Sequence, residues 1–310
     1  MMRCLHQAIV AVGGVVGVLW LSSISPALAQ SHALPTLSID AQSETSTAEG
    51  QLNLGLQSIQ QGQLDPAIAA FRQAAALNPN LTLAHYNLGL ALRQKGDLQG
   101  AANAFYQAIQ TQPEFALSYA NLGAALLEGN NLDLAVQYLE RSIQLDPQLD
   151  IGYYNLGLVR RLQGDAQGAI AAFEQTRQLS PNAPEAAYYA GVTYLQLGNV
   201  SKAGEALQQA VALNPNYPEA LYSLGTIYYQ QGNLEQALSA FRRAAEANPN
   251  YPNAYYGAGM VFMSQGQYAD AQQVLQYARD LFMALGNSQW AASAEQLRQQ
   301  AQQGAAVPRR

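Results

Sequence analysis

The sequence predicts an all-α solenoid, a fold in which one small helical unit is repeated along the chain. A glycine recurs every 34 residues seven times, and a proline keeps the same spacing six times. A fixed period of this length is typical of arrays in which each unit packs only against its neighbours. The glycines are Gly55, Gly89, Gly123, Gly157, Gly191, Gly225 and Gly259, and the prolines are Pro79, Pro113, Pro147, Pro181, Pro215 and Pro249.

Each unit is predicted to hold two helices, as residues 218–251 illustrate. Pro218 suits the first turn of a helix, and apolar residues follow it at helical spacing. Gly232 breaks this helix, Glu235 begins a second one, and Pro249 ends the second because proline cannot continue a helix. The seven units are 48–81, 82–115, 116–149, 150–183, 184–217, 218–251 and 252–283, and positions are counted from the first residue of each unit.

Small and large residues alternate at positions that predict the packing. Gly225 and Ala237 are expected where the two helices of one unit approach closely, since a larger side chain there would overpack the contact by about 1–3 kcal/mol. Phe241 is expected to fill the gap between adjacent units. Its counterparts are Phe71, Phe105, Leu139, Phe173, Leu207 and Leu275.

The first 29 residues have the layout of a signal peptide. Arg3 lies in a short polar head, an apolar stretch runs from Ala8 to Leu21, and Ala27-Leu28-Ala29 supplies a small-residue cleavage site. The stretch is shorter than the roughly 20 residues that a spanning helix needs. We expect cleavage after Ala29, no stable membrane insertion afterwards, and a location in the periplasm or an equivalent lumen rather than secretion. An uncleaved signal anchor is the alternative.

Residues 30–47 are small and polar, and they are predicted to form a disordered linker. The end of this linker, Ser46-Thr47-Ala48-Glu49, fits the capping box that opens a helix. Because Cys4 is the only cysteine, the mature chain has none. Disulfides and thiol chemistry are therefore excluded.

A last helix is predicted beyond the seventh unit, which lacks the repeat proline and has Met283 in its place. Gly286 ends the preceding helix, and apolar residues recur from Trp290 at helical spacing beside a face rich in glutamine and arginine. We predict that residues 287–303 form the polar-faced capping helix that the open end of a solenoid needs. Residues 304–310 are expected to form a flexible tail.

The pattern of the units resembles the tetratricopeptide repeat, of the exported bacterial type, over residues 48–283. The shared positions are Leu at 7, Gly at 8, a large residue at 11, Ala at 20, Phe or Leu at 24, Ala at 27 and Pro at 32. The resemblance implies antiparallel helix pairs stacked into a right-handed superhelix, with the first helix of each pair lining a concave face. The family's usual tryptophan at position 4 is replaced by His85, Tyr119, Tyr153, Ala187, Leu221 and Tyr255.

The resemblance also implies that positions 2, 5, 6, 9, 12 and 13 form the concave face. Asparagines at position 6 could bond the backbone of an extended peptide, although asparagine is also simply common there. Tyrosines at position 5 offer contact area, with packing between helices as the alternative. A carboxylate clamp is disfavoured, because lysines are missing there. The expected peptide-binding residues are Asn53, Asn87, Asn121, Asn155, Tyr86, Tyr154, Tyr188, Tyr222, Tyr256, Arg93 and Arg161.

Catalytic and metal-binding patterns are not found. With no cysteine and two histidines, the mature chain cannot build a metal site, and His85 is expected to replace an aromatic side chain in packing. Gly257-Ala258-Gly259 lacks the third glycine and the preceding strand of a dinucleotide fingerprint. Asp65, Asp133 and Glu235 begin second helices, where acids favour the helix dipole. We therefore expect no catalysis, no cofactor and no metal.

The composition limits the class of partner. The 310-residue chain is only 12% charged, has a net charge of −6 and contains two lysines, so it lacks the basic surface of a nucleic-acid binder. These observations favour a non-enzymatic scaffold or assembly factor of the cell envelope that binds a peptide segment of a partner protein in its groove. The alternatives are a carrier or sensor of a small ligand such as a glycan, and a regulatory subunit of an envelope enzyme complex. Self-association is a further option.

Overall fold

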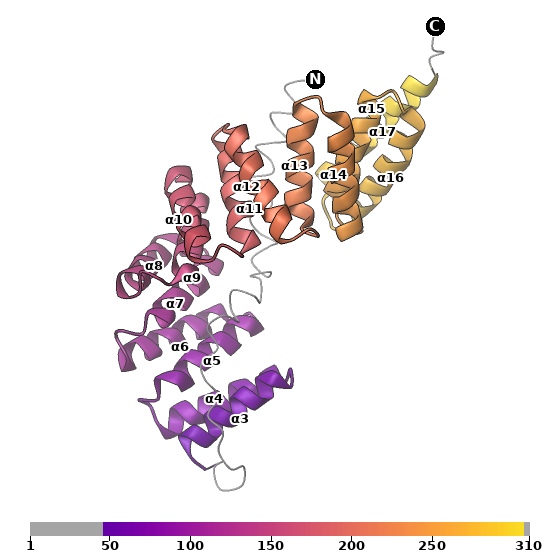
Figure 1. Cartoon of the computed structure of the whole chain (residues 1–310). Helices are drawn as coiled ribbons and strands as arrows, with labels where there is room; N and C mark the ends of the chain where they lie inside the picture. Colours follow the sequence, from indigo (N-terminus) through magenta and orange to yellow (C-terminus); the bar gives the residue numbers. More distant parts are fainter. Residues whose placement is uncertain (1–45, 307–310) are drawn as a thin grey trace. The chain divides into compact units, whose positions relative to one another are not determined.

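The computed structural model describes residues 46–306, and every regular element within this range is a helix (Figure 1). The chain divides into two compact units, one ending at Pro181 and the other beginning at Asn182. The expected signal peptide, linker residues 30–45 and tail residues 307–310 lie outside the described residues. The prediction of an all-α fold built from consecutive helix pairs is confirmed.

The first unit contains four helix pairs, one in each of the first four repeats (Figure 1). We call the two members of a pair its first and second helix. The pairs are α3 (Ala48–Gln60) with α4 (Leu64–Leu77), α5 (Thr82–Lys95) with α6 (Leu98–Thr111), α7 (Ala116–Glu128) with α8 (Leu132–Leu145), and α9 (Asp150–Leu162) with α10 (Ala166–Leu179).

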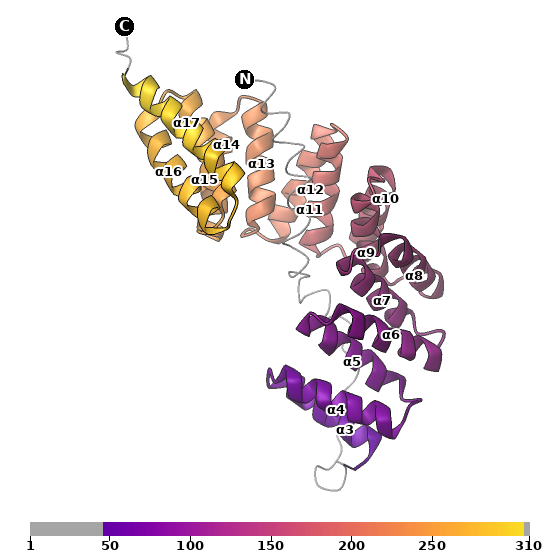
Figure 2. The same ribbon diagram turned by 180° about the vertical axis from the view of Figure 1, so that it is seen from behind.

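The second unit contains three further pairs and a final helix, which lies along α16 (Figure 2). The pairs are α11 (Pro184–Gln196) with α12 (Val200–Leu213), α13 (Pro218–Gln230) with α14 (Leu234–Ala247), and α15 (Pro252–Ser264) with α16 (Tyr268–Ala284). The final helix is α17 (Ser288–Ala306).

A single residue with left-handed backbone makes the turn between the two helices of a repeat. Gly96 has a φ of 85°, and Gly232, where the sequence predicted the break, has a φ of 78°. Glycine suits this conformation because it has no Cβ atom. Asn130, with a φ of 59°, takes the place of glycine in the third repeat. Asparagine tolerates this region better than most other residues.

Short polar side chains cap several of the second helices. The carboxylate of Asp97 accepts a hydrogen bond from the backbone N–H of Gly100 at 2.9 Å, and Asp165 does the same for Gly168 at 2.8 Å. These bonds satisfy N–H groups that have no partner within the helix. The acids predicted in the first turns of second helices are found there, at Asp65, Asp133 and Glu235.

The first helix of the array begins one residue later than the capping box requires. Thr47, rather than Ser46, is the N-cap of α3, and its Oγ1 accepts a hydrogen bond from the N–H of Gly50 at 3.0 Å. Glu49 is therefore the second residue of the helix instead of the third, out of register for the reciprocal bond of a capping box. The cap was predicted one residue too early.

A large side chain at position 24 packs against the glycine at position 8 of its own repeat, and Phe241 also packs against the next repeat. A Cβ atom built on Gly225 would lie 2.6 Å from Cε1 of Phe241, in the same repeat. The same ring carbon lies 2.6 Å from the Cβ position of Gly257, in the following repeat. For the side chain of Phe241, the sequence predicted only the contact between repeats. Ala237 is fully buried, as expected for a residue where the two helices approach closely.

The last helix closes the apolar end of the second unit. Ala291 and Ala294 of α17 pack with Ala278 and Phe282 of α16, and the Trp290 ring stacks on Phe282 with centroids 5.9 Å apart. The helix continues to Ala306, beyond the predicted end at 303. Its extension has a packing reason, because a Cβ atom on Gly304 would lie 2.8 Å from the ring of Tyr268.

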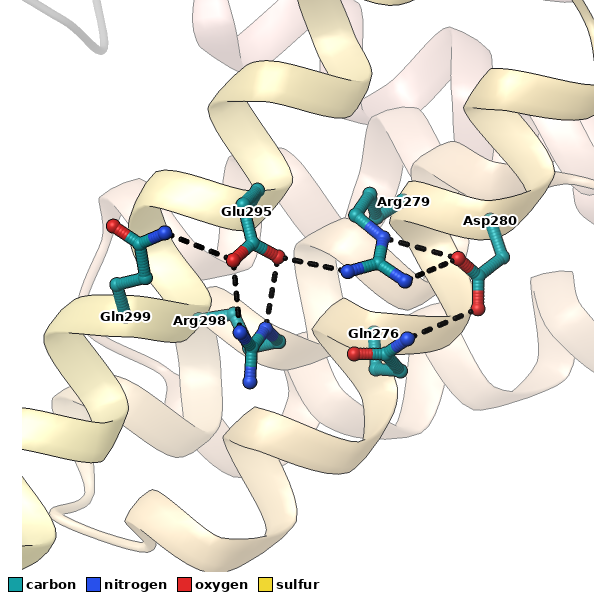
Figure 3. Close-up of polar contacts among 6 residues, drawn as sticks. All are labelled: Gln276, Arg279, Asp280, Glu295, Arg298 and Gln299. Atoms are coloured by element: carbon teal, nitrogen blue, oxygen red, sulfur yellow. Dashed lines mark hydrogen bonds and ion pairs between the residues drawn. The ribbon is translucent and has the colours of Figure 1, made fainter.

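An ion pair also joins α17 to α16 (Figure 3). Glu295 of α17 accepts a hydrogen bond from Nη1 of Arg279 on α16 at 3.1 Å and one from Nη2 of Arg298 at 2.8 Å. Gln299 donates to the same carboxylate at 2.9 Å. The bonds from Arg298, Gln299 and Arg279 lower the pKa of Glu295 to about 2.

Candidate functional site

Hydrogen bonds between successive first helices show which sides of these helices face each other. Nε of Arg93 on α5 donates to Oε1 of Glu128 on α7 at 2.8 Å. The hydroxyl groups of Tyr229 on α13 and Ser264 on α15 lie 2.9 Å apart. Both pairs join position 12 of one repeat to position 13 of the next. The contact between first helices therefore follows the same register in both units.

Another hydrogen bond between first helices shows which side of them is left free of the neighbouring first helices. Nδ2 of Asn121 on α7 donates to the hydroxyl of Tyr86 on α5 at 3.2 Å, which joins position 5 to position 6 of the next repeat. Positions 5 and 12 thus face the following repeat, and positions 6 and 13 face the preceding one. At about 100° per residue, positions 2 and 9 fall between these two sets on the helix. Side chains at positions 2 and 9 consequently lie on the side of each first helix that is expected to line the concave groove.

Aliphatic side chains occupy most of these two positions in the first unit. Leu83, Leu90 and Leu117 are half-buried, and Leu56 is 37% exposed. They were not among the residues selected from the sequence, although the register of positions 2 and 9 could have identified them. Ile151 and Leu158, at the same positions of the fourth repeat, are buried. We call the aliphatic residues at these positions the aliphatic row: Leu56, Leu83, Leu90, Leu117, Ile151 and Leu158.

Most of the tyrosines predicted at position 5 lie inside the helix array. The ring of Tyr86 meets the edge of Phe115 at a centroid distance of 5.1 Å, and Tyr222 meets Tyr251 at 5.8 Å. Burial raises the pKa of both Tyr86 and Tyr222 to about 12. These rings thus pack between helices, the alternative interpretation of this position. Tyr154 and Tyr188 are also buried, and Tyr256 is half-buried.

The asparagines at position 6 bond mainly within the protein. Nδ2 of Asn87 donates to the carbonyl of Leu83 at 2.7 Å, and Nδ2 of Asn121 donates to the carbonyl of Leu117 at 3.0 Å, one turn earlier in the same helix. Asn53 is half-buried. Peptide binding by this row stays a prediction, and the amide groups of Asn87 and Asn121 already have protein partners.

Asn155 differs from Asn121 although both hold position 6. Its side chain is 1% exposed, and its Oδ1 is buried without a hydrogen-bond partner. The preceding repeat has Ala120 at position 5 and Leu127 at position 12. Asn121 instead faces a tyrosine and an arginine at these two positions. The polar bonds of position 6 therefore depend on the composition of the repeat before it.

Four polar residues of the second and third repeats form one cluster. Nη1 of Arg93 donates to Oδ1 of Asn121 at 3.2 Å, in addition to the ion pair with Glu128, and Asn121 bonds Tyr86. The side chains of Arg93 and Glu128 are only 14% and 12% exposed. Since Glu128 balances its charge, Arg93 is not a free cation for a peptide carboxylate. Arg161 holds the same position two repeats later and is half-buried.

His85 has a structural role at position 4. Its Nε2 lies 2.8 Å from the carbonyl oxygen of Pro79, the repeat proline of the preceding unit. The hydroxyl of Tyr119 donates to Pro113 in the same way at 3.1 Å. At position 4, His85, Tyr119 and Tyr255 thus tie their first helices to the turn before them, which agrees with the interpretation of His85 as an aromatic substitute.

Within residues 46–306, no group of three or more histidine, cysteine, aspartate or glutamate side chains is placed to hold a metal ion. None of the helices described is both long and apolar enough to cross a membrane.

Comparison with known families gives matches along most of the described chain. Models described as tetratricopeptide repeat match residues 83–115, 116–149, 154–218, 194–252 and 222–284. A model described as TPR repeat matches residues 55–96. A comparison with curated protein sequences finds no match.

Solved structures of repeat proteins are also similar. The chain is 28% identical to YrrB, described as a TPR protein with an unusual peptide-binding site, with a TM-score of 0.52 over 63% of this chain and 100% of that one. A tetratricopeptide repeat protein from Parabacteroides merdae has a TM-score of 0.61 at 16% identity, over 82% and 99% of the two chains. PilF of Pseudomonas aeruginosa has a TM-score of 0.61 at 20% identity, over 69% and 97%.

Proposed function

The chain belongs to the tetratricopeptide repeat family, and on this basis we propose that it is a non-enzymatic scaffold or assembly factor that holds a segment of a partner protein in the groove of its first helices. Proteins with this fold serve as scaffolds for protein–protein interaction. The observation that supports the groove in particular is the aliphatic row of the first unit. Four leucines of this row, Leu56, Leu83, Leu90 and Leu117, are partly exposed and offer apolar area without needing to be ordered on binding.

The likeness to YrrB supports the same proposal. That protein has a peptide-binding site, and the two chains share 28% of their residues over its whole length. The polar cluster of Arg93, Glu128, Asn121 and Tyr86 flanks the row and holds α5 against α7. Under this proposal the cluster fixes the distance between the two helices, and the leucines make the contact with the partner segment.

Photo-crosslinking from inside and outside the groove tests the proposal. A benzoylphenylalanine replaces Leu90 in the groove, and a second variant carries it at Tyr106, which is 44% exposed on the second helix α6. We expect the variant at position 90 to form a specific protein adduct in living cells, and the variant at position 106 to form none of that mass. Equal adducts at both positions would place the partner outside the groove, and an adduct with a small ligand would favour a carrier.

The proposal extends to export. Residues 1–29 have the order of charge, apolar residues and small residues that a signal peptidase recognises. A mature chain without cysteine tolerates an oxidising compartment without forming disulfides. Determination of the N-terminal residue of the protein from its own cell should give Gln30, in a periplasmic or equivalent fraction. A chain that begins at Met1 or Met2 would instead indicate an uncleaved signal anchor.

A further inference from the structure

The second unit repeats an arrangement of one glutamate and two tyrosines. In the sixth repeat, Glu219 at position 2 lies one helical turn before Tyr222 at position 5, and the Tyr222 ring meets Tyr251 of position 34 at 5.8 Å. In the fifth repeat, Tyr188 meets Tyr217 at 5.0 Å in the same way. We call the two sets the acidic triads: Glu185 with Tyr188 and Tyr217, and Glu219 with Tyr222 and Tyr251.

A matching site in the first unit shows what is particular about the triads. Tyr86 and Phe115 of the second repeat form the same aromatic pair, with centroids 5.1 Å apart. Position 2 of that repeat is Leu83, a member of the aliphatic row. The aromatic pair is thus a general packing element, whereas the carboxylate beside it belongs to the fifth and sixth repeats. Position 2 is expected to line the groove, so each carboxylate is expected at its wall.

Neither carboxylate forms an ion pair with a lysine, arginine or histidine of residues 46–306. Glu185 is half-buried, and its Oε2 is buried without a hydrogen-bond partner. Glu219 is also half-buried, and within the described part of the chain its carboxylate is hydrogen-bonded by its own backbone and by no side chain. Burial raises the pKa of Glu219 above its usual value. It also raises the pKa of Tyr251 well above its usual value, and Glu219 adds to this effect.

The basic residues of the second unit are engaged elsewhere. Lys202 lies over the Tyr194 ring, and Arg242 lies over the Phe262 ring. Arg243 donates to the carbonyl of Pro215. The remaining two within the described residues bond acids at the end of the unit: Arg279 pairs with Asp280 and Glu295, and Arg298 pairs with Glu295.

The helix dipole accounts for an acid in the first turn but not for its burial. Glu185 and Glu219 follow Pro184 and Pro218 at the beginning of α11 and α13, where a negative charge is favourable. Glu235 has the same favourable place at the beginning of α14, yet it is exposed to solvent. Partial burial of an unpaired carboxylate costs free energy, so the triads require a further explanation.

We infer that the two acidic triads are binding sites for cationic side chains, and that the groove of the second unit takes a basic segment of the partner protein. The inference rests on the proposed function and names the chemistry of the segment. An arginine entering a triad would pair its guanidinium with the carboxylate and lay it against the half-buried ring of Tyr217 or Tyr251. It would supply the counter-charge that the groove lacks.

The spacing of the triads limits the segment. They lie one repeat apart, on neighbouring first helices, and packed helices are about 8–10 Å apart. An extended chain advances about 3.3 Å per residue, so two cationic side chains two or three residues apart would reach both triads. In the first unit the aliphatic row carries no charge, and Glu49, the one carboxylate at position 2 there, is exposed and lacks the aromatic pair. The two units therefore differ in the chemistry that they offer to a segment.

Selection from a random 12-residue display library on the mature protein tests the inference. We expect enriched peptides to carry two arginines or lysines two or three residues apart. A synthetic, fluorescein-labelled copy of the most enriched peptide is then titrated by anisotropy against the wild type and Glu185→Gln/Glu219→Gln. The double variant should bind about tenfold or more weakly, and the difference should shrink at high salt.

Glu235→Gln is the matched control, because it removes one charge from a first turn of the same unit outside the groove. It should bind like the wild type, and circular dichroism should show equal helicity for all three proteins. Enrichment of apolar peptides that bind the double variant unchanged would overturn the inference while keeping the proposed groove. If all enriched peptides cross-link only to the second helices, both proposals fail.

Discussion

The backbone of Gly225 lies directly against the ring of Phe241, with the Cβ position of the glycine 2.6 Å from Cε1. Glycine at position 8 is thus required by the large residue at position 24 of its own repeat. We predict that Gly225→Ala lowers the free energy of unfolding by about 1–3 kcal/mol, because the ring must move within a close-packed core. Urea denaturation followed by circular dichroism measures the change.

Gly204 provides the control for that substitution. It lies inside α12, and nothing is within 4 Å of its Cβ position. Gly204→Ala should raise the free energy of unfolding by about 0.5–1 kcal/mol, since alanine favours the helix. Equal destabilisation by both substitutions would show that the Phe241 contact is not the cause.

The ion pair between Arg93 and Glu128 should be strongly coupled. Arg93→Ala leaves a largely buried carboxylate without its partner, so we expect a loss of about 1–3 kcal/mol in unfolding free energy. A double-mutant cycle with Glu128→Gln should give a coupling energy of about 0.5 kcal/mol or more. Lys95 and Asp65, an exposed pair, should show a coupling of at most about 0.5 kcal/mol. Similar coupling for the two pairs would contradict a special role of the polar cluster.

The docking of α17 should depend on pH. The pKa of Glu295 is lowered to about 2 in the folded protein, so its stabilising effect is complete above its ordinary value near 4.5 and is lost as pH falls toward 2. Trp290, the only tryptophan of the expected mature chain, stacks on Phe282 and reports the docking. Its fluorescence should change between pH 4.5 and pH 2, while Glu295→Gln should show a weaker interface already at pH 7. An identical pH profile for the two proteins would rule out this carboxylate as the cause.

Removal of one complete repeat should preserve the fold of the rest. Deletion of residues 218–251 removes α13 and α14 together, and Leu207 at position 24 of the preceding repeat can take the place of Phe241 beside Gly257. We expect a helical protein with a cooperative thermal transition. Deletion of 234–251 alone leaves α13 without its second helix and should abolish that transition. Scanning calorimetry distinguishes these outcomes, and a lost transition for both deletions would contradict the repeat assignment.

The sequence by itself determined the elements of this protein. The glycine at position 8, the alanine at position 20 and the proline at position 32 mark helix contacts and helix ends, and these depend on short-range geometry that recurs in every repeat. The turn at Gly232 and the acid at Asp65 were predicted because they too depend on local geometry at the end or the beginning of a helix. The cap at Thr47 was placed one residue too early, because either Ser46 or Thr47 can supply the hydroxyl oxygen.

Only the tertiary structure decided what each groove position does. Asn121 and Asn155 hold the same position in identical helical patterns, yet Asn121 bonds a tyrosine and an arginine while Oδ1 of Asn155 has no hydrogen-bond partner. By the same register, the residues opposite Asn155 are Ala120 and Leu127 of the preceding repeat, which offer no side-chain hydrogen bond. Periodicity fixes the direction of a side chain within its helix, whereas its burial and its partners depend on the neighbouring repeat.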